Sequence, residues 1–176
     1  MVRWKEELAK IYSSLSEEAP EKRALDVGTG MGVNLGVLLR ALPREFKVYS
    51  VDVDPRSLSS AEKMYYAEVE AGRLTLVEAP AEKLPFEDGF FGLVAEVTVL
   101  HHVGDRGAAL VEAHRVLAPG GFLVVMDWTP ESSLNPHSPL IMEESMREVL
   151  EKFKEIFYVE DVRIYRDYYI VVGSRR

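Results

Sequence analysis

The amino-acid sequence predicts an α/β fold: a doubly wound, mostly parallel sheet of seven strands, with helices on both faces and an antiparallel hairpin strand at the C-terminal end. Through residue 126, short apolar stretches alternate with amphipathic ones, and such alternation is typical of strand–helix–strand units with right-handed crossovers. A glycine-rich turn follows the first predicted strand. Only Arg166 and Asp167 separate the last two predicted strands, and so short a connection cannot join parallel neighbours.

Proline and glycine mark where most of the predicted helices begin or end. Apolar residues at helical spacing predict a first helix from Trp4, which ends before Pro20. Pro43 ends the second helix, and Pro55 and Pro139 open two others. Strands are predicted over residues 23–27, 48–52, 74–78, 93–97, 122–126, 159–165 and 168–172. The helix from Pro55 is expected to carry Leu58, Ala61, Met64 and Tyr65 on one face and to end at Gly72, and Pro119-Gly120-Gly121 is expected to be a turn.

Composition favours a single domain over residues 1–176, with residues 1–20 as a helix packed on it. The absence of cysteine excludes disulfides and thiolate chemistry, and no apolar block marks a signal peptide or a membrane anchor, so we expect a cytoplasmic protein. Glutamine is absent and asparagine occurs twice, while Glu and Arg are abundant, a composition typical of a thermophile.

The formal net charge of -8 makes a nucleic-acid partner improbable, because phosphate contacts need clustered Lys and Arg. A net charge of this sign does not exclude a local patch of basic residues. We therefore expect a small-molecule partner, and the sequence carries no signal for an oligomeric state.

The turn after the first strand, Gly28 to Gly32, is typical of a nucleotide-cofactor loop. Its glycines permit left-handed backbone angles and leave no side chain between chain and ligand. The third glycine comes one residue earlier than in the G-x-G-x-x-G pattern of dinucleotide sites, where Val33 stands instead. Asp26 would repel a pyrophosphate but suits an ammonium and a sulfonium. The charges therefore favour S-adenosylmethionine over NAD.

Four motifs occur in order at the C-terminal edges of predicted strands, where ligands bind in open α/β sheets. They read LDVGTGMG, VYSVDVDP, AEKLPFEDGFFGLVAEVTVLHHV and RVLAPGGFLVVMDW. With them the chain resembles the class I S-adenosylmethionine-dependent methyltransferases, in particular the group that includes the quinone-biosynthesis methyltransferases. The resemblance covers most of the chain and implies a Rossmann-like methyltransferase fold.

The resemblance also implies a cofactor site. Asp26 would face the cofactor's amino group directly or through water, Asp52 would accept both ribose hydroxyls, and Val53 or Asp54 would pack beside the adenine. Asp54 is also the better candidate to cap the helix that begins at Pro55. The cofactor-binding residues expected are Asp26, Gly28, Thr29, Gly30, Gly32, Asp52, Val53, Ala81, Glu82 and Val97.

The sequence departs from the family pattern at two positions that usually hold aspartate, namely Pro80 and Gly92. Without a carboxylate at position 80, the adenine amino group must find a backbone carbonyl or Glu82. The aspartate that Gly92 replaces is ordinarily structural, so we expect a changed local hydrogen bond there and no loss of chemistry.

Other side chains near the ligand edge have two interpretations each. Glu96 is either a charge partner for cofactor or substrate or a satisfied acid at a strand end. Asp127 and Trp128 could bind a cationic or flat acceptor, or else cap a turn and cover the core. Trp4 and Tyr12 could form a lid over the cofactor, although core packing is the simpler role.

Methyl transfer from a sulfonium places the reactivity in the cofactor, so the protein mainly aligns the acceptor and excludes water. Alignment can account for roughly 7–11 kcal/mol of the barrier and a general base for roughly 3–5 kcal/mol. A base is therefore optional. The candidates are His102 and His137, with His101 less favoured and His114 expected to pack or face solvent. No pair of residues has metal-ligand spacing, so no metal is predicted.

Three functions follow from these residues. The leading one is a methyltransferase acting on a small acceptor. The second is a subunit that binds S-adenosylmethionine or its product without catalysis and activates a partner, and the third is an NAD-dependent oxidoreductase, which shares Asp52 but conflicts with Asp26. The chain reads Glu96-Val97-Thr98-Val99 where amino-methylating DNA and RNA enzymes carry an asparagine–proline signature, which disfavours nucleobase methylation.

Overall fold

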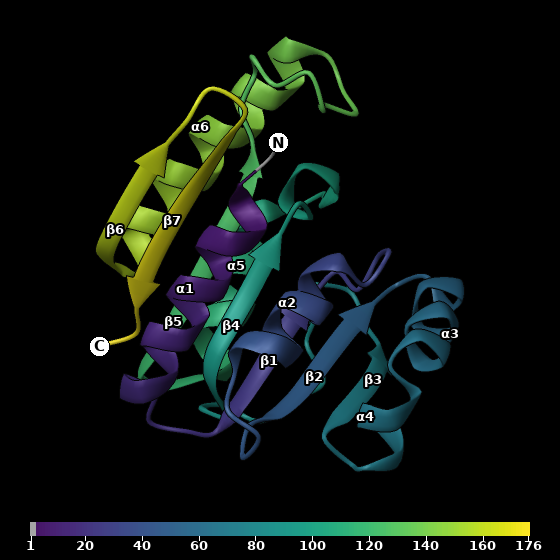
Figure 1. Ribbon diagram of the computed structural model, residues 1–176. Coiled ribbons are helices and arrows are strands. Elements are labelled where there is room, and N and C mark those ends of the chain that lie inside the picture. The colour runs from purple at the N-terminus through teal and green to yellow at the C-terminus, as the bar shows by residue number, and fades with distance from the viewer. Residues whose placement is uncertain (1–2) are drawn as a thin grey trace.

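Seven strands form one sheet in the computed structural model, which describes residues 3–176 (Figure 1). The strands are β1 (Arg23–Val27), β2 (Lys47–Asp52), β3 (Leu74–Glu78), β4 (Phe91–Val97), β5 (Leu117–Trp128), β6 (Tyr158–Ile164) and β7 (Tyr168–Ser174). Their order is β3-β2-β1-β4-β5-β7-β6. Strands β1 to β5 pair in parallel and β7 runs antiparallel to both β5 and β6, so the predicted fold class is confirmed.

The helices cover both faces of this sheet (Figure 1). They are α1 (Trp4–Glu18), α2 (Val33–Ala41), α3 (Pro55–Met64), α4 (Tyr66–Glu70), α5 (Arg106–Val116), α6 (Pro139–Ile156) and the short 3-10 turn η1 (Leu100–His102). Within residues 3–176 no helix is both long and apolar enough to cross a membrane. Met1 and Val2, the start of the predicted N-terminal segment, lie outside the described residues.

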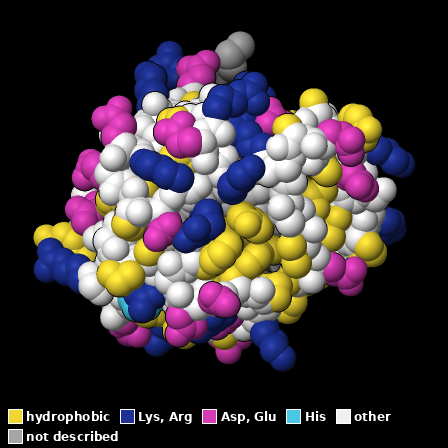
Figure 2. All heavy atoms as spheres, turned by 90° about the horizontal axis from the view of Figure 1, so that it is seen from below, with side chains coloured by type: hydrophobic (Ala, Val, Ile, Leu, Met, Phe, Trp, Pro, Cys, Tyr) yellow, Lys and Arg dark blue, Asp and Glu magenta, His cyan; other side chains and the backbone are white. Residues whose placement is uncertain are grey.

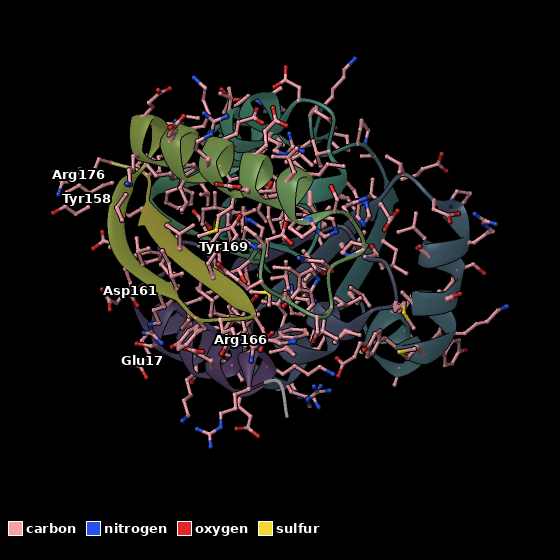
Figure 3. The ribbon with its side chains drawn as sticks, turned by 90° about the horizontal axis from the view of Figure 1, so that it is seen from above. Glu17, Tyr158, Asp161, Arg166, Tyr169 and Arg176 are labelled. Atoms are coloured by element: carbon pink, nitrogen blue, oxygen red, sulfur yellow. The ribbon has the colours of Figure 1, made fainter. Side chains whose placement is uncertain are left out.

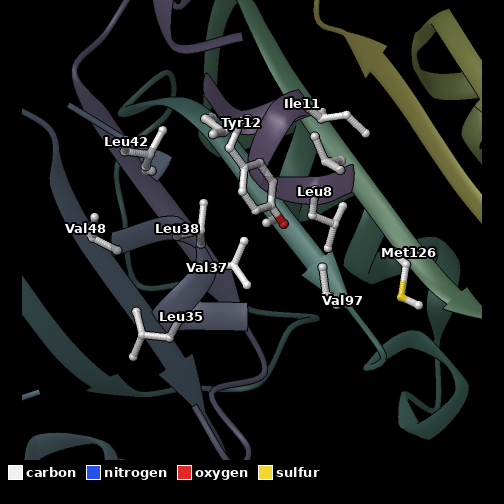
Figure 4. Close-up of a cluster of buried hydrophobic side chains, with 14 of the residues drawn as sticks. Leu8, Ile11, Tyr12, Leu35, Val37, Leu38, Leu42, Val48, Val97 and Met126 are labelled. Atoms are coloured by element: carbon white, nitrogen blue, oxygen red, sulfur yellow. The ribbon is translucent and has the colours of Figure 1, made fainter. Parts of the chain in front are cut away.

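Each face of the sheet has its own hydrophobic core. On one face, Tyr12 of α1 and Leu38 of α2 pack against Val97 and Met126 of the central strands (Figure 4). On the other, Phe153 of α6 packs with residues of α5, β5 and β7. Strand β4 is buried along its whole length because both cores cover it. Each fully buried large apolar side chain contributes roughly 1.5–3 kcal/mol, so these two layers fix the strand order around the sheet's centre.

Two predicted elements differ from the observed ones. The helix expected to continue from Pro55 to Gly72 breaks at Tyr65, whose hydroxyl donates to the Gly32 carbonyl at 2.7 Å. On the face predicted to be apolar, Ala61 is buried but Met64 is 60% exposed. The expected turn at Pro119-Gly120-Gly121 is part of β5. There the Gly120 amide donates to the Arg175 carbonyl, which extends pairing into the C-terminal residues.

Gly92 is required by the packing of the chain that leads into β1. A Cβ atom at Gly92 would stand 2.1 Å from the Glu21 carbonyl oxygen, closer than any real contact. The Arg23 side chain bridges the same two segments by donating to the Phe90 carbonyl at 2.6 Å. The aspartate that the family pattern usually has at this position could not fit here. The change to glycine therefore concerns the packing of the fold, in agreement with the ordinarily structural role of that aspartate.

Charges of both signs are interspersed on the face at the amino ends of the parallel strands. Figure 2 shows Lys and Arg side chains lying among Asp and Glu there, around a hydrophobic patch.

Helix α1 is fastened to the C-terminal hairpin by one carboxylate. Glu7 accepts hydrogen bonds from Arg163 at 2.8 Å, Tyr165 at 2.5 Å and Tyr168 at 2.9 Å. Although burial raises the pKa of Glu7, these hydrogen bonds together bring it below its ordinary value. The N-terminal helix is thus joined to residues more than 150 positions away.

Replacing Glu7 with alanine is expected to lower the free energy of unfolding by about 1–3 kcal/mol, because several hydrogen bonds to a charged group are lost. Urea unfolding at neutral pH measures the effect. Glu17 lies on the same helix but points outward (Figure 3), so Glu17→Ala is the matched control and should change stability by less than about 0.5 kcal/mol. Equal effects of the two substitutions would show that the Glu7 contacts add no stability.

Candidate cofactor and acceptor site

A cavity of about 1050 Å³ opens at the carboxyl edge of the sheet, around the point where β1 and β4 lie side by side. Strand order reverses there, because the chain proceeds from β1 outward to β3 and then returns to β4. Ligands of open α/β sheets bind at such switch points. The walls come from the loops after β1, β2, β3 and β4, with Trp4 from α1 and Trp128 from β5.

The loop after β1 forms part of the cavity wall, and its glycines leave the backbone exposed to the cavity. Gly28 has φ +83°, and a Cβ atom there would stand 2.6 Å from the Val99 side chain, so only glycine fits. Gly30 has φ +47° and faces open space, with the Gly28 carbonyl 3.9 Å from its Cβ position. The amides of Gly28 and Thr29 both donate to the Val51 carbonyl, which fixes the loop on β2.

Asp26 anchors this loop from behind. Its carboxylate is 1% exposed and accepts hydrogen bonds from Asn34 and Ser50, each at 2.7 Å. Asn34 in turn accepts from the Tyr12 hydroxyl at 2.8 Å, and Ser50 shares a hydrogen bond with Thr29. Burial raises the pKa of Asp26 to about 6, against the lowering effect of Asn34 and Ser50.

Asp26 is not among the residues that line the cavity, and its expected contact with the cofactor, direct or through water, stays a prediction. Asn34, in the first turn of α2, does line the cavity. Sequence reasoning did not name Asn34 as a site residue, although asparagine is scarce in this chain and Asn34 stands out for that reason. Gly32 also lies outside the wall, as the residue before α2.

Asp52 lines the cavity at the end of β2. One of its oxygens accepts from the Gly30 amide at 2.8 Å and the other from the Asp54 amide at 2.9 Å. A carboxylate has about four acceptor positions, so about two remain for ligand hydroxyls. Asp54 instead accepts from the Arg56 amide at 2.9 Å and caps α3, which confirms the capping interpretation.

The loop after β3 supplies the next wall. Val53, Ala81 and Glu82 all line the cavity together with Pro80. Pro80 offers no side-chain acceptor where the family pattern usually has a carboxylate, so Glu82 is the acidic side chain that this loop contributes to the wall. The Ala79 amide donates to the Asp52 carbonyl at 3.1 Å and joins this loop to the end of β2.

Val97 and Thr98, which the sequence places together at the end of the fourth strand, both line the cavity. Thr98 has φ +53°, the one positive φ of a residue other than glycine within residues 3–176. Such backbone strain costs about 1–3 kcal/mol and is often found at functional sites. The Thr98 amide donates to the Met126 carbonyl at 2.8 Å, which holds the strained residue at the cavity wall.

Three of the four histidines meet beside this cavity. His101 and His102 form η1 after β4, and His137 comes from the loop between β5 and α6. His102 lines the cavity, and its Nδ1 lies 3.4 Å from Nε2 of His137. Burial lowers the pKa of His102, and the neighbouring imidazoles lower it further. The two predicted catalytic histidines are thus adjacent, although His137 itself does not line the cavity.

Asp127 binds the buried member of this cluster and not an external ligand. Its Oδ1 lies 2.6 Å from His101 Nδ1, and both side chains are 2% exposed. The carboxylate also accepts from the backbone amides of His101 and Trp128. Trp128 meets Trp4 edge to face at 6.4 Å, and both rings line the cavity while packing on the core.

A second buried acid lies on the neighbouring strand. Both carboxylate oxygens of Glu96 lack a hydrogen-bond partner among the described residues, and burial raises its pKa to about 8. The hydroxyl of Tyr169 on β7 is similarly buried without a partner. Figure 3 shows this tyrosine directed into the molecule below α6. Glu96 therefore does not face solvent, and it is absent from the cavity wall.

Fold and site together define a class: the S-adenosylmethionine-dependent methyltransferases with a Rossmann-like sheet. The chain belongs to the family described as "Methyltransferase domain", whose model matches residues 25–125. The matched segment runs from β1 into β5, so it includes every loop that follows the first four strands. The resemblance found in the sequence is confirmed.

Curated relatives and solved structures agree with this family. The Ubiquinone/menaquinone biosynthesis C-methyltransferase UbiE of Geotalea daltonii is 34% identical over 121 residues, which are 68% of this chain and 51% of that protein. The Demethylmenaquinone methyltransferase of Thermus thermophilus is 39% identical over 114 residues, 65% of this chain and 50% of that protein. The chain thus spans about half the length of these relatives. A SAM dependent methyltransferase from Aquifex aeolicus shares the fold, with a TM-score of 0.79 at 22% identity, covering 96% of this chain and 88% of that one.

Gly30→Val should weaken binding of S-adenosylhomocysteine by more than about tenfold, because a branched side chain would enter the cavity from a residue with positive φ. Gly72→Val is the matched control: Gly72 has φ +64° with nothing within 4 Å, so it suffers the same backbone strain away from the cavity. Calorimetric titration of both variants makes the comparison. Unchanged affinity in Gly30→Val would contradict the placement of the loop.

Glu96→Gln should remove a pH dependence of stability. The folded-state pKa of about 8 exceeds the ordinary 4.5, so the folded state holds a proton that the unfolded state releases. The contribution of Glu96 is complete below about pH 4.5 and falls as pH rises to about 8, by up to about 1.4 kcal/mol per pH unit. Urea unfolding from pH 5 to 9 should show this slope in the parent and in Glu17→Gln but not in Glu96→Gln; parallel slopes in all three would exclude a protonated Glu96.

Proposed function

We propose that this protein transfers a methyl group from S-adenosylmethionine to a small-molecule acceptor by in-line displacement. The observation that carries the proposal is the cavity at the β1/β4 switch point, where a left-handed glycine loop and the Asp52 carboxylate face the same space. Membership of the methyltransferase domain family supports the enzyme over a non-catalytic binding subunit, and it supports S-adenosylmethionine over a pyridine coenzyme.

The cofactor's parts correspond to successive loops in this proposal. The backbone of Gly28, Thr29 and Gly30 with Asn34 binds the methionine end, and Asp52 binds the ribose hydroxyls. The adenine lies against Val53, Ala81 and Glu82, and Val97 approaches the sulfonium. Asp26 and Gly32 act indirectly, since Asp26 orients Asn34 and Gly32 positions the start of α2.

The acceptor occupies the opposite end of the cavity, next to His102. Trp4, Trp128 and Val103 provide apolar walls there, which suits a flat acceptor. The relatives named for ubiquinone, menaquinone and demethylmenaquinone are consistent with such a shape. His102 and His137 are the groups proposed to act on the accepting atom. Their contribution is secondary to alignment, because the sulfonium carries the reactivity.

Composition supports the remaining proposals. The net charge of -8 favours a small acceptor over nucleic acid, and the absence of cysteine favours a cytoplasmic location. A single domain over the whole chain and a thermophilic source are likewise predictions from length and residue content.

Asp52→Ala tests the cofactor site. Loss of hydrogen bonds from ribose hydroxyls to a charged group should weaken S-adenosylhomocysteine binding by about 1.5–3 kcal/mol, roughly 10- to 150-fold. Asp54→Ala is the control, because it removes the cap of α3 beside Asp52 without touching the cavity wall. Titration calorimetry with S-adenosylhomocysteine and with NAD measures both; binding of NAD in place of the adenosyl compound, or unaltered affinity in Asp52→Ala, would reject this assignment.

A further inference from the structure

The three clustered histidines have the geometry of a metal site. One ring nitrogen from each of His101, His102 and His137 can be chosen so that all three lie within 4.8 Å of one another. The distance of 3.4 Å between His102 Nδ1 and His137 Nε2 is long for a hydrogen bond. Two nitrogens bound at about 2.0–2.1 Å to a tetrahedral zinc ion lie about 3.3–3.4 Å apart, which is the separation observed.

The surroundings of His101 also match those of a metal ligand. Its Nδ1 is occupied by Asp127 at 2.6 Å in a buried pair, so Nε2 is the nitrogen left to bind an ion. A carboxylate that holds the far side of a ligating imidazole fixes its tautomer and orientation, as in carboxylate–histidine–zinc arrangements. The backbone amides of His101 and Trp128 hold Asp127 in turn. The buried negative charge also compensates a cation.

Simple aromatic packing explains the fourth histidine but not these three. His114 on α5 packs against Phe157 with ring centroids 5.3 Å apart, which is an ordinary hydrophobic contact. In contrast, the ring centroids of His101 and His102 lie 4.0 Å apart, and His137 joins these two rings from a position 35 residues after His102.

We propose that His101, His102 and His137 together bind one divalent transition-metal ion, such as Zn²⁺ or Co²⁺, with Asp127 as the outer partner of His101. Three nitrogen ligands leave a coordination position open, which is typical of catalytic sites and not of structural ones. Because His102 lines the acceptor end of the cavity, the open position is accessible to a ligand there.

The position of the ion limits the chemical class of the acceptor. This step rests on the proposed function. An ion beside the acceptor end would hold the substrate through a hydroxyl or carbonyl oxygen and stabilise its anionic form by acting as a Lewis acid. The acceptor would therefore be a phenol, enol or related oxygen compound. His102 and His137 would then position the ion, and neither would serve as a free base.

The test uses the complete chain without a polyhistidine tag, stripped of metal with a chelator and titrated with CoCl₂. Visible absorption reports nitrogen ligation of Co²⁺, and calorimetry reports stoichiometry. We expect one Co²⁺ per chain, at least tenfold weaker binding in both His102→Ala and His137→Ala, and about 10- to 100-fold weaker binding in Asp127→Asn. His114→Ala should bind as the parent does, and MgCl₂ should not compete because Mg²⁺ prefers oxygen ligands.

Both histidine substitutions are at residues outside the buried core, and circular dichroism verifies that each variant is folded. Absence of Co²⁺ binding by the parent, equal binding by the parent and His137→Ala, or an equal loss in His114→Ala would each overturn the metal site. Titration with S-adenosylhomocysteine alone separates this result from the cofactor assignment. If the adenosyl compound binds while Co²⁺ does not, the metal proposal fails and the methyltransferase proposal stands.

Discussion

The buried carboxylate of Asp26 is the constraint on which the cofactor loop depends. This acid is 1% exposed, and its hydrogen-bond donors come from two different elements, Asn34 of α2 and Ser50 of β2. Tyr12 adds α1 to the network through Asn34. Removing any donor would leave a buried acceptor unsatisfied, at a cost of about 1–3 kcal/mol. The same contacts that stabilise the fold therefore hold the loop in the shape that a cofactor requires.

Asp26 and Glu96 show how neighbouring strands give two buried acids different properties. Both lie near the carboxyl ends of adjacent strands, where Asp26 pairs with Ala95 and the next residue is Glu96. Asp26 has two donors and a pKa of about 6, whereas Glu96 has no partner among the described residues and a pKa of about 8. Burial acts on both, so the hydrogen bonds account for the difference. At neutral pH the Asp26 carboxyl can therefore be ionised beside the glycine loop, while the Glu96 carboxyl stays protonated.

Sequence reasoning recovered the features that depend on local pattern. All seven strands follow from apolar runs and from the Pro and Gly residues between them, and most expected cofactor residues line the cavity. It failed where a distant contact decides the outcome. The helix break at Tyr65 depends on a hydrogen bond to Gly32, and the burial of Asp26 depends on Asn34 and Ser50. Residue spacing also gave no sign of a histidine cluster, because His137 is 35 positions from His102.

Strand topology explains why that cluster forms nonetheless. Strands β4 and β5 are parallel neighbours, so the segments that follow them emerge at the same edge of the sheet. His101 and His102 follow β4, while Asp127 ends β5 and His137 comes from the loop beyond it. The other half of that edge, after β1, β2 and β3, carries the glycine loop, Asp52 and the Ala81 loop. In the proposed function, the order of strands thus divides the cavity into a cofactor side and an acceptor side. Because the histidines follow β4 and β5 and Trp4 comes from α1, substitutions on the proposed acceptor side would leave the loops after β1, β2 and β3 unchanged.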